Sequence, residues 1–324
     1  MKPLVLASFV SVVGLALSAV PACSGSSATT DGPVDTGTLD TGAPDTTPAD
    51  TGDKDTGLAD TGTVDTGTAD ADAPIPWPTC DAKPATATTS TLPEIWKANP
   101  TTPVFTWVSG AIVTGVSQGG CSAGKACQIF LQDGSFASLA ASSGHAIRFF
   151  ASIVTGERFA GIAVGDKVDV AAYAVRYTLG GQNELLLEVN DLLRGCMKKT
   201  GTGTIDPVAA TLAELGTVDA YENKYGPVLV KAVELSGKPD VSLGMTFGLF
   251  TIGVDAGGAP NVSLSPYFLP GAAFTAPLVP STKIDFTSVT GVFGMFVVSA
   301  TGDAGTATKY LQIYPRTMAD LVKK

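Results

Sequence analysis

The sequence predicts an all-β fold of two small barrels in tandem, joined by a short helix and preceded by a disordered tether. Three observations carry this prediction. Short runs rich in Val, Ile and Thr recur after residue 104 and are separated by Gly, Asp and Pro, which is typical of strands and turns. A convincing helix pattern occurs once, at 206–216. Residues 31–72 repeat Asp-Thr-Gly at five-residue spacing and contain few large apolar side chains.

The N-terminus has the pattern of an export signal. A positive charge at Lys2 precedes an apolar run from Leu4 to Val20, which is too short and too poorly flanked for a stop-transfer span. The next residues complete Val-Pro-Ala-Cys at 20–23, which resembles the lipobox of bacterial lipoproteins, whose invariant cysteine is acylated before cleavage. The resemblance implies a signal peptide over 1–22 and a lipid on Cys23. An ordinary signal peptide cleaved after Ala22 is the alternative.

Residues 23–77 comprise the lipidated cysteine and the predicted linker. Between Ser24 and Trp77 stand eleven Asp and one Lys, so this segment alone carries a charge of −10. It has too little apolar surface to offset its chain entropy, and about 54 residues of flexible chain would span roughly 40 Å. We therefore expect a tether that holds the folded part off the membrane. In enteric bacteria a residue other than Asp after the lipidated cysteine is associated with the outer membrane, which Ser24 therefore implies.

The first barrel is predicted over residues 78–200. Its five strands are expected at 104–117, 128–132, 146–154, 164–177 and 185–189. In the fourth strand the apolar positions change parity, because Val168 and Val170 alternate on one parity and Tyr173 to Tyr177 on the other. A β-bulge near Ala171-Ala172 would restore one buried face. Five strands, one of them kinked, match a small closed barrel.

The second barrel is predicted over residues 201–324, after the connecting helix. Asp206 as N-cap, Pro207 at the first helical position and Gly216 after the last turn mark the bounds of that helix. Strand patterns follow at 225–233, 245–254, 285–292, 295–299 and 310–314, with a long loop rich in Pro and Gly at 259–281.

Short motifs in both units are informative beyond their secondary structure. They lie at Gly110–Val116, Ile129–Gly134 and Val164–Val170 in the first unit, and at Tyr225–Val233, Val289–Val292 and Tyr310–Leu321 in the second. These segments are similar to the strand signatures of OB-fold modules in bacterial exported proteins, some of them attached to extracellular nucleases. The resemblance implies two OB-like barrels and a ligand face across strands two and three. Nuclease activity is not implied, because no nuclease domain accompanies the modules in this sequence.

Five cysteines fit an oxidising compartment. If Cys23 carries lipid, four remain and three pairings are available. We favour Cys121–Cys127, which closes a small loop, and Cys80–Cys196, which links the start of the folded region to its middle. A zinc site is the alternative. Five residues separate Cys121 from Cys127, more than the usual two to four, and His145 is the single histidine.

No motif of a reactive centre is found. The sequence has no Gly-x-Ser-x-Gly elbow, no phosphate loop and no dinucleotide fingerprint, and His145 is interpreted as a structural residue. Five carboxylates could converge for glycosidic chemistry, although solvated strand faces explain them better: Glu157, Asp166, Asp169, Glu184 and Glu188. We expect no catalytic residue, cofactor or metal. A cell-surface hydrolase or nuclease-related protein acting on phosphodiesters or glycans is the alternative.

Aromatic and basic side chains of the first unit are of the type that binds ligands by stacking. They are Phe130, Arg148, Phe149, Phe150, Tyr173, Arg176 and Tyr177, and we expect the ligand face at Arg148, Phe150, Tyr173, Arg176 and Tyr177. Residues 78–324 carry eighteen basic and nineteen acidic side chains, a balance that disfavours a polyanion such as nucleic acid. The sequence thus predicts an exported, lipid-anchored, non-enzymatic binding or scaffold protein. Its expected partners are the membrane and a neutral glycan, a peptide or another envelope protein.

Overall fold

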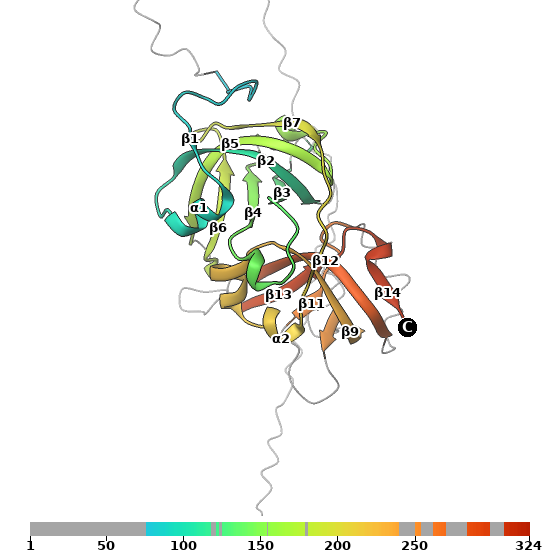
Figure 1. Cartoon of the computed structure of the whole chain (residues 1–324). Helices are drawn as coiled ribbons and strands as arrows, with labels where there is room; N and C mark the ends of the chain where they lie inside the picture. The colour runs from blue at the N-terminus through green and yellow to red at the C-terminus, as the bar shows by residue number, and fades with distance from the viewer. Residues whose placement is uncertain are drawn as a thin grey trace, which may run out of the picture. The chain divides into compact units, whose positions relative to one another are not determined.

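The computed structural model describes residues 76–117, 121–122, 125–153, 155–178, 181–239, 250–253, 262–269, 284–298 and 308–324. The predicted signal peptide, Cys23 with its predicted lipid and nearly all of the predicted tether lie outside these residues. Residues 69–324 group into one compact unit that is mostly strand (Figure 1). Within the part of the chain that the structure describes, no helix has both the length and the apolarity that a membrane crossing requires.

The first barrel contains five strands whose order closes on itself. Its elements are β1 (Thr88–Thr89), α1 (Leu92–Ala98), β2 (Val104–Val116), β3 (Cys127–Gln132), η1 (Ala140–Ser142), β4 (Ala146–Ala151), η2 (Gly156–Phe159), β5 (Asp166–Tyr177), β6 (Glu184–Val189) and β7 (Cys196–Thr202). The hydrogen-bonded order is β2-β3-β4-β6-β5 and back to β2, and β4 and β6 are parallel. This is the strand order of an OB-fold barrel, as the sequence predicts. β1 extends the sheet beside β2, and β7 extends it beside β5.

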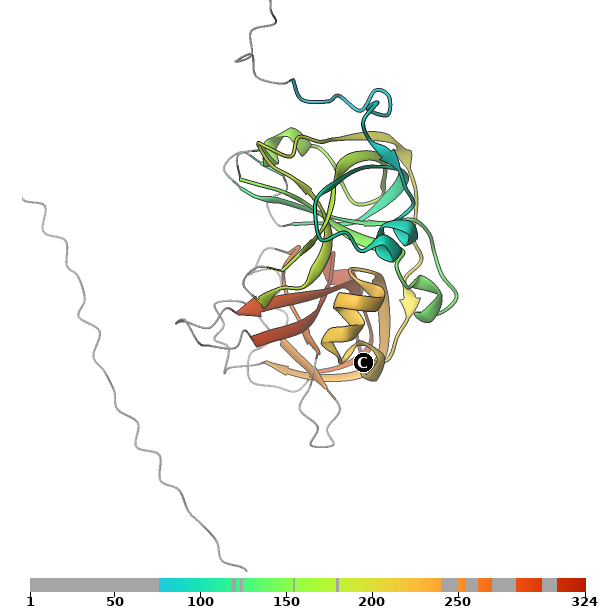
Figure 2. The same ribbon diagram turned by 90° about the vertical axis from the view of Figure 1, so that its left-hand side faces the viewer.

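The second barrel repeats this topology strand for strand. Its elements are β8 (Val208–Ala209), α2 (Leu212–Leu215), η4 (Ala220–Tyr225), β9 (Leu229–Pro239), β10 (Phe250–Gly253), β11 (Val262–Leu264), β12 (Ile284–Val298), β13 (Thr308–Tyr314), η6 (Met318–Asp320) and β14 (Leu321–Lys323). The order β9-β10-β11-β13-β12 returns to β9, with β11 and β13 parallel. The fold is therefore two OB-like barrels in tandem, with short helical segments between them (Figure 2).

The two halves also begin in the same way. A two-residue strand pairs in parallel with the first barrel strand, β1 with β2 and β8 with β9. A helix with a Thr-x-x-Glu capping box follows each of these short strands. The backbone N–H of Thr91 donates to Glu94 at 2.8 Å, and that of Thr211 donates to Glu214 at 2.8 Å. The two halves therefore share one structural plan, from the short first strand to the strand order of the barrel.

The connecting helix begins later than the sequence predicts. Val208 pairs with Val230 as part of β8, and α2 begins only at Leu212, with Thr211 as its N-cap. Asp206 is not an N-cap; its backbone N–H donates to the Ser135 hydroxyl at 2.8 Å. The ladder pairing of β8 and the complete capping box at Thr211 outweigh the Asp-Pro signal. That prediction of the helix start was wrong.

The bulge predicted near Ala171-Ala172 was also wrong. The pairing of β5 with β2 and with β7 is continuous through these residues. The inward row continues from the two valines into small residues, as Val168, Val170, Ala172 and Ala174. Ala171 lies on the outer face and packs with Cys80 and Cys196. The parity never changes, because the larger side chains from Tyr173 to Tyr177 belong to the outer face.

Each barrel has its own hydrophobic core. The core of the first barrel is built from inward side chains that include Ile129, Leu131, Ile147, Phe149, Leu185 and Leu187. The core of the second barrel includes Val230, Ala232, Val289, Phe293, Leu311 and Ile313. β12 is a single strand of 15 residues where the sequence predicts two. Gly291 and Gly294 in its middle resemble a turn signal, but they allow Tyr314 to pack closely against the strand.

Candidate functional site

The second barrel covers part of the outer face of β3 and β4, strands two and three of the first barrel. Phe130 on β3 packs with Leu229, Val292 and Tyr314. The side-chain oxygen of Gln132 accepts a hydrogen bond from the backbone N–H of Leu229 at 2.9 Å. The face on which OB barrels bind oligonucleotides or oligosaccharides is therefore part of a contact within this chain.

A pocket of about 200 Å³ remains at this contact. Both barrels and the η4 segment contribute to its lining, which consists of Gln128, Phe130, Arg148, Gln182, Tyr221, Tyr267, Met295, Phe296, Val297 and Tyr314. The lining combines apolar and aromatic groups with a few polar ones, as is usual for small-molecule sites. Its volume is smaller than the roughly 300–1,000 Å³ of pockets for drug-sized ligands.

Arg148 and Glu184 form a buried ion pair beside the pocket. Nη2 of Arg148 lies 2.6 Å from Oε2 of Glu184, and the two side chains are 13% and 6% exposed. Nη1 of Arg148 donates to the side-chain oxygen of Gln128 at 3.0 Å, and the Tyr221 hydroxyl donates to Oε1 of Glu184 at 2.5 Å. β4 and β6 are adjacent and parallel, which brings these charges together. Arg148 therefore lines the pocket with its charge balanced by Glu184.

Three tyrosines at the pocket keep their protons far above neutral pH. Burial, followed by the neighbouring Glu184 carboxylate, raises the pKa of Tyr221 well above its ordinary value. Burial likewise raises the pKa of Tyr267 to about 12 and shifts that of Tyr314 in the same direction. All three hydroxyls therefore remain neutral hydrogen-bond donors.

The aromatic wall of the pocket is fixed by a close approach to β12. The rings of Tyr267 and Tyr314 stack with centroids 4.8 Å apart, and Phe130 meets Tyr314 edge-on at 6.3 Å. The Tyr314 ring lies directly over Gly294, where an added Cβ would stand 2.0 Å from a ring carbon. Gly294 is thus required by the position of Tyr314, and the sequence alone does not indicate this.

A second polar bridge joins the barrels around Glu222, which is 5% exposed. Lys309 on β13 lies 2.5 Å from the Glu222 carboxylate. Nη1 of Arg176 donates to the backbone oxygen of Glu222 at 3.0 Å, and its Nε donates to the Asn99 side chain. Asn183 contacts the Glu222 carboxylate at 3.4 Å. Arg176 thus acts in this bridge and is not among the residues that line the pocket.

The five residues of the predicted ligand face do not lie together in the structure. Of its five residues, Arg148 lines the pocket. Phe150 and Tyr173 are cross-strand neighbours of Glu188 on the outer surface, where Tyr173 stacks on Phe105 at 4.8 Å. Tyr177 is half-buried at the end of β5, opposite Glu184. Phe149, one of the aromatic residues of the first unit that could stack on a ligand, instead packs inward against Phe159.

Sequence reasoning missed the contributions of the second half of the chain. Tyr221, Tyr267 and Tyr314 line the pocket although they are distant in sequence from β3 and β4. The aromatic strand 310–314 is the one signal that could have suggested Tyr314. The second barrel packs on β3 and β4 through tertiary contacts, and strand patterns in the sequence do not encode such contacts.

Three of the five dispersed carboxylates have separate partners. Asp166 lies 2.5 Å from Lys199, Asp169 accepts from Ser109 at 2.7 Å, and Glu184 is held by Arg148. His145 lies 2.8 Å from Asp133, near the Phe136 ring. Among the residues that the structure covers, no three His, Cys, Asp or Glu side chains are placed to hold a metal ion.

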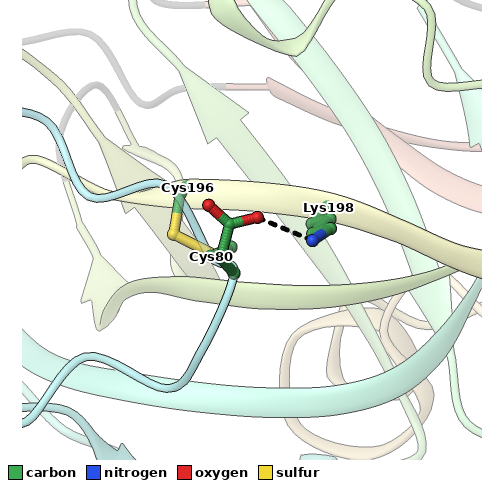
Figure 3. The surroundings of a disulfide bond; sticks show 4 residues. Cys80, Cys196 and Lys198 are labelled. Atoms are coloured by element: carbon green, nitrogen blue, oxygen red, sulfur yellow. Dashed lines mark hydrogen bonds and ion pairs between the residues drawn. A yellow bond between two sulfur atoms is a disulfide. The ribbon is translucent and has the colours of Figure 1, made fainter.

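The four remaining cysteines form two disulfides in the pairing that the sequence favours. Cys80 bonds to Cys196 on β7, with the two Cα atoms 5.6 Å apart. Beside this disulfide Lys198 contacts Asp81 at 2.6 Å, the ion pair drawn in Figure 3. Cys121 bonds to Cys127 at the start of β3. The first bond ties the N-terminal segment of the folded unit to the barrel.

No family model and no curated protein matches this chain. Among solved structures, the chain is similar to a chain of a replication protein A heterotrimer bound to single-stranded DNA, with 11% sequence identity and a TM-score of 0.25. The match covers 65% of this chain and 49% of that chain, so this chain spans about half the length of the protein it matches. The OB-like fold is therefore assigned from the strand order and not from this likeness.

Proposed function

We propose that this protein is an exported, lipid-anchored, non-enzymatic binding protein of the cell envelope that holds a small uncharged polar ligand between its two barrels. The observation that carries the proposal is the pocket beside the Arg148–Glu184 pair, where polar groups and aromatic rings meet. Because each charge of the pair neutralises the other, the pocket offers hydrogen bonds but little attraction for an anion or a cation.

A single sugar unit at the end of a neutral glycan fits this chemistry best. Its hydroxyls match the amides of Gln128 and Gln182 and the tyrosine hydroxyls, and its C–H faces match the rings of Phe130 and Tyr267. The volume of about 200 Å³ suits one small ring and not a chain of them. Because the second barrel occupies part of the outer face of β3 and β4, a long polymer has no open face to lie across. A ligand that enters the pocket by one end is therefore favoured.

Calorimetric titration of the full chain with a panel of neutral monosaccharides tests the pocket, using the unlipidated Cys23→Ala variant. We expect saturable binding by one or more sugars. Tyr267→Phe, which removes one hydroxyl from the pocket, should weaken binding by about two- to tenfold. Tyr177→Phe removes a hydroxyl outside the pocket and should not. Absence of binding by the folded protein, or equal losses in both variants, would refute the pocket as the site.

The location is a separate part of the proposal and rests on residues 1–24. A lipid on Cys23 would anchor the chain, with Ser24 directing it to the outer membrane. Cys23→Ala should move the protein from the membrane fraction to the soluble fraction of the cell. Unchanged membrane association of this variant would count against the anchor.

A further inference from the structure

One end of the first barrel carries two exposed aliphatic side chains on neighbouring loops. Ile153 follows β4 and is 60% exposed, and Leu192 follows β6 and is 91% exposed. A leucine so fully exposed gains nothing from the fold of the monomer, since the hydrophobic effect favours its removal from water.

The topology places the loops of Ile153 and Leu192 together. β4 and β6 are adjacent and parallel, and Ala151 near the end of β4 pairs with Val189 at the end of β6. The backbone N–H of Ser152 donates to the oxygen of Val189 at 3.1 Å, which joins the loop of Ile153 to the loop of Leu192. We call this the apolar tip, defined by Ile153 and Leu192.

An aromatic ring between two cations lies next to the apolar tip. The guanidinium of Arg158 lies 4.3 Å from the ring centroid of Trp77, and that of Arg194 lies 5.7 Å away. Arg194 is two residues from Leu192, and Arg158 belongs to η2, which follows the loop of Ile153. The acidic Glu157 and Asp191 stand in the same loops, so the local charges nearly balance.

Trp77 also stands at the place where the N-terminal segment joins the barrel. Figures 1 and 2 both show this segment, coloured blue, reaching the first barrel from the top, the direction in which the β4 arrow points in Figure 1. The described chain therefore begins beside the apolar tip, and a lipid on Cys23 would tether the barrel from this end.

We propose that the apolar tip docks on the lipid bilayer. Leu192 and Ile153 enter the acyl region, while Trp77, Arg158 and Arg194 lie at the level of the headgroups, where tryptophan and snorkelling arginine side chains are stable. Attraction is mainly apolar, because the charges of the two loops nearly cancel. The inference uses the proposed anchor in one respect: a flexible linker keeps the apolar tip within reach of the bilayer and raises its local concentration there, so weak contacts suffice.

The test uses the full chain with Cys23→Ala, so that binding does not depend on the anchor. Flotation with phosphatidylcholine vesicles should recover part of the protein, and added salt should change this little. Leu192→Ser should lower the partition coefficient by about tenfold, and Ile153→Ser by less. Val233→Ser is the matched control, because Val233 is 55% exposed on β9 of the second barrel. It should leave the partition coefficient unchanged.

Three outcomes would overturn the proposal: no flotation at any lipid concentration, an equal loss in Val233→Ser, or a concentration-dependent dimer in sedimentation that Leu192→Ser abolishes. The last would assign the apolar tip to a second copy of this chain. Because Leu192 is almost fully exposed, its replacement should leave the unfolding transition unchanged, and circular dichroism checks this. Sugar binding in the pocket and membrane release of Cys23→Ala are measured separately, so either can fail without the other.

Discussion

Tyr221, in the segment between the barrels, donates its hydroxyl to the carboxylate of Glu184 in the first barrel at 2.5 Å. Arg148 holds the other oxygen of the same carboxylate at 2.6 Å. A carboxylate of the first barrel is thus satisfied from both sides at the contact between the barrels. Because the three groups are buried, each depends on the others for its hydrogen bonds.

Removing one member of this group should destabilise the protein strongly. Arg148→Met leaves the Glu184 carboxylate buried without its cation, and we expect the free energy of unfolding to fall by about 3–5 kcal/mol. Replacing all three, as Arg148→Met, Glu184→Leu and Tyr221→Phe together, should cost much less, because no buried group is left unpaired. Urea unfolding of both variants measures this. A triple variant less stable than the single one would contradict the expectation.

Stability should fall with rising pH in the alkaline range. The pKa of Tyr267 is about 12 in the folded state, against an ordinary value of 10.0. The unfolded chain therefore loses this proton first, and the stabilisation, complete below pH 10, is lost as pH rises toward 12. Tyr267 should contribute at most about 3 kcal/mol to this loss, and Tyr221 and Tyr314, whose pKa values are also raised, add to it. Tyrosinate absorbance and unfolding at several pH values measure it. Tyr267→Phe should flatten the dependence, and an unchanged slope in that variant would speak against it.

The two disulfides should contribute unequally. Cys80 and Cys196 are 116 residues apart in sequence, and Cys121 and Cys127 are 6 apart. In the chain-entropy model, replacing the first pair by serine should lower the free energy of unfolding by about 5 kcal/mol, and replacing the second by about 2 kcal/mol. Denaturant unfolding of the two double variants compares them directly. Equal losses would mean that loop entropy does not dominate.

Gly226 should tolerate no side chain. Its backbone has φ 57° and ψ −148°, a region essentially confined to glycine, and an added Cβ would lie 2.6 Å from the Trp96 ring. The Trp96 ring cannot easily move away from an added Cβ, because its Nε1 donates to the backbone oxygen of Ala146 at 2.9 Å. Gly226→Ala should therefore cost about 3 kcal/mol or more. Gly161→Ala is the control, since Gly161 has φ 87° with open space around it and should lose only about 1 kcal/mol.

Local patterns were sufficient for much of the fold. The β2, β3 and β13 strands follow from runs of Val, Ile and Thr between turn residues. The OB-like class of the two units was implied by the resemblance of their short motifs to OB-fold modules. The short strands β1, β7, β8, β11 and β14 were not predicted, because they pair at sheet edges or span few residues, and so leave little periodicity in the sequence.

The site was harder to predict for a different reason. Arg148 was identified because OB barrels bind ligands on β3 and β4, but its partners Glu184 and Tyr221 are 36 and 73 residues away. Nothing in a strand pattern says that a second barrel covers the first. The residues Phe150, Tyr173 and Tyr177 were grouped with Arg148 by chemistry, and the register places them elsewhere.

The bond between Cys80 and Cys196 has a mechanical consequence. If the chain is anchored as we propose, drag on the cell surface pulls the folded unit at residue 76. The disulfide passes this tension to β7 and its neighbour β5, so the two-residue strand β1 does not bear the load first. Single-molecule stretching should therefore release about 400 Å more contour length after reduction, corresponding to the 116 residues that the bond shields from load.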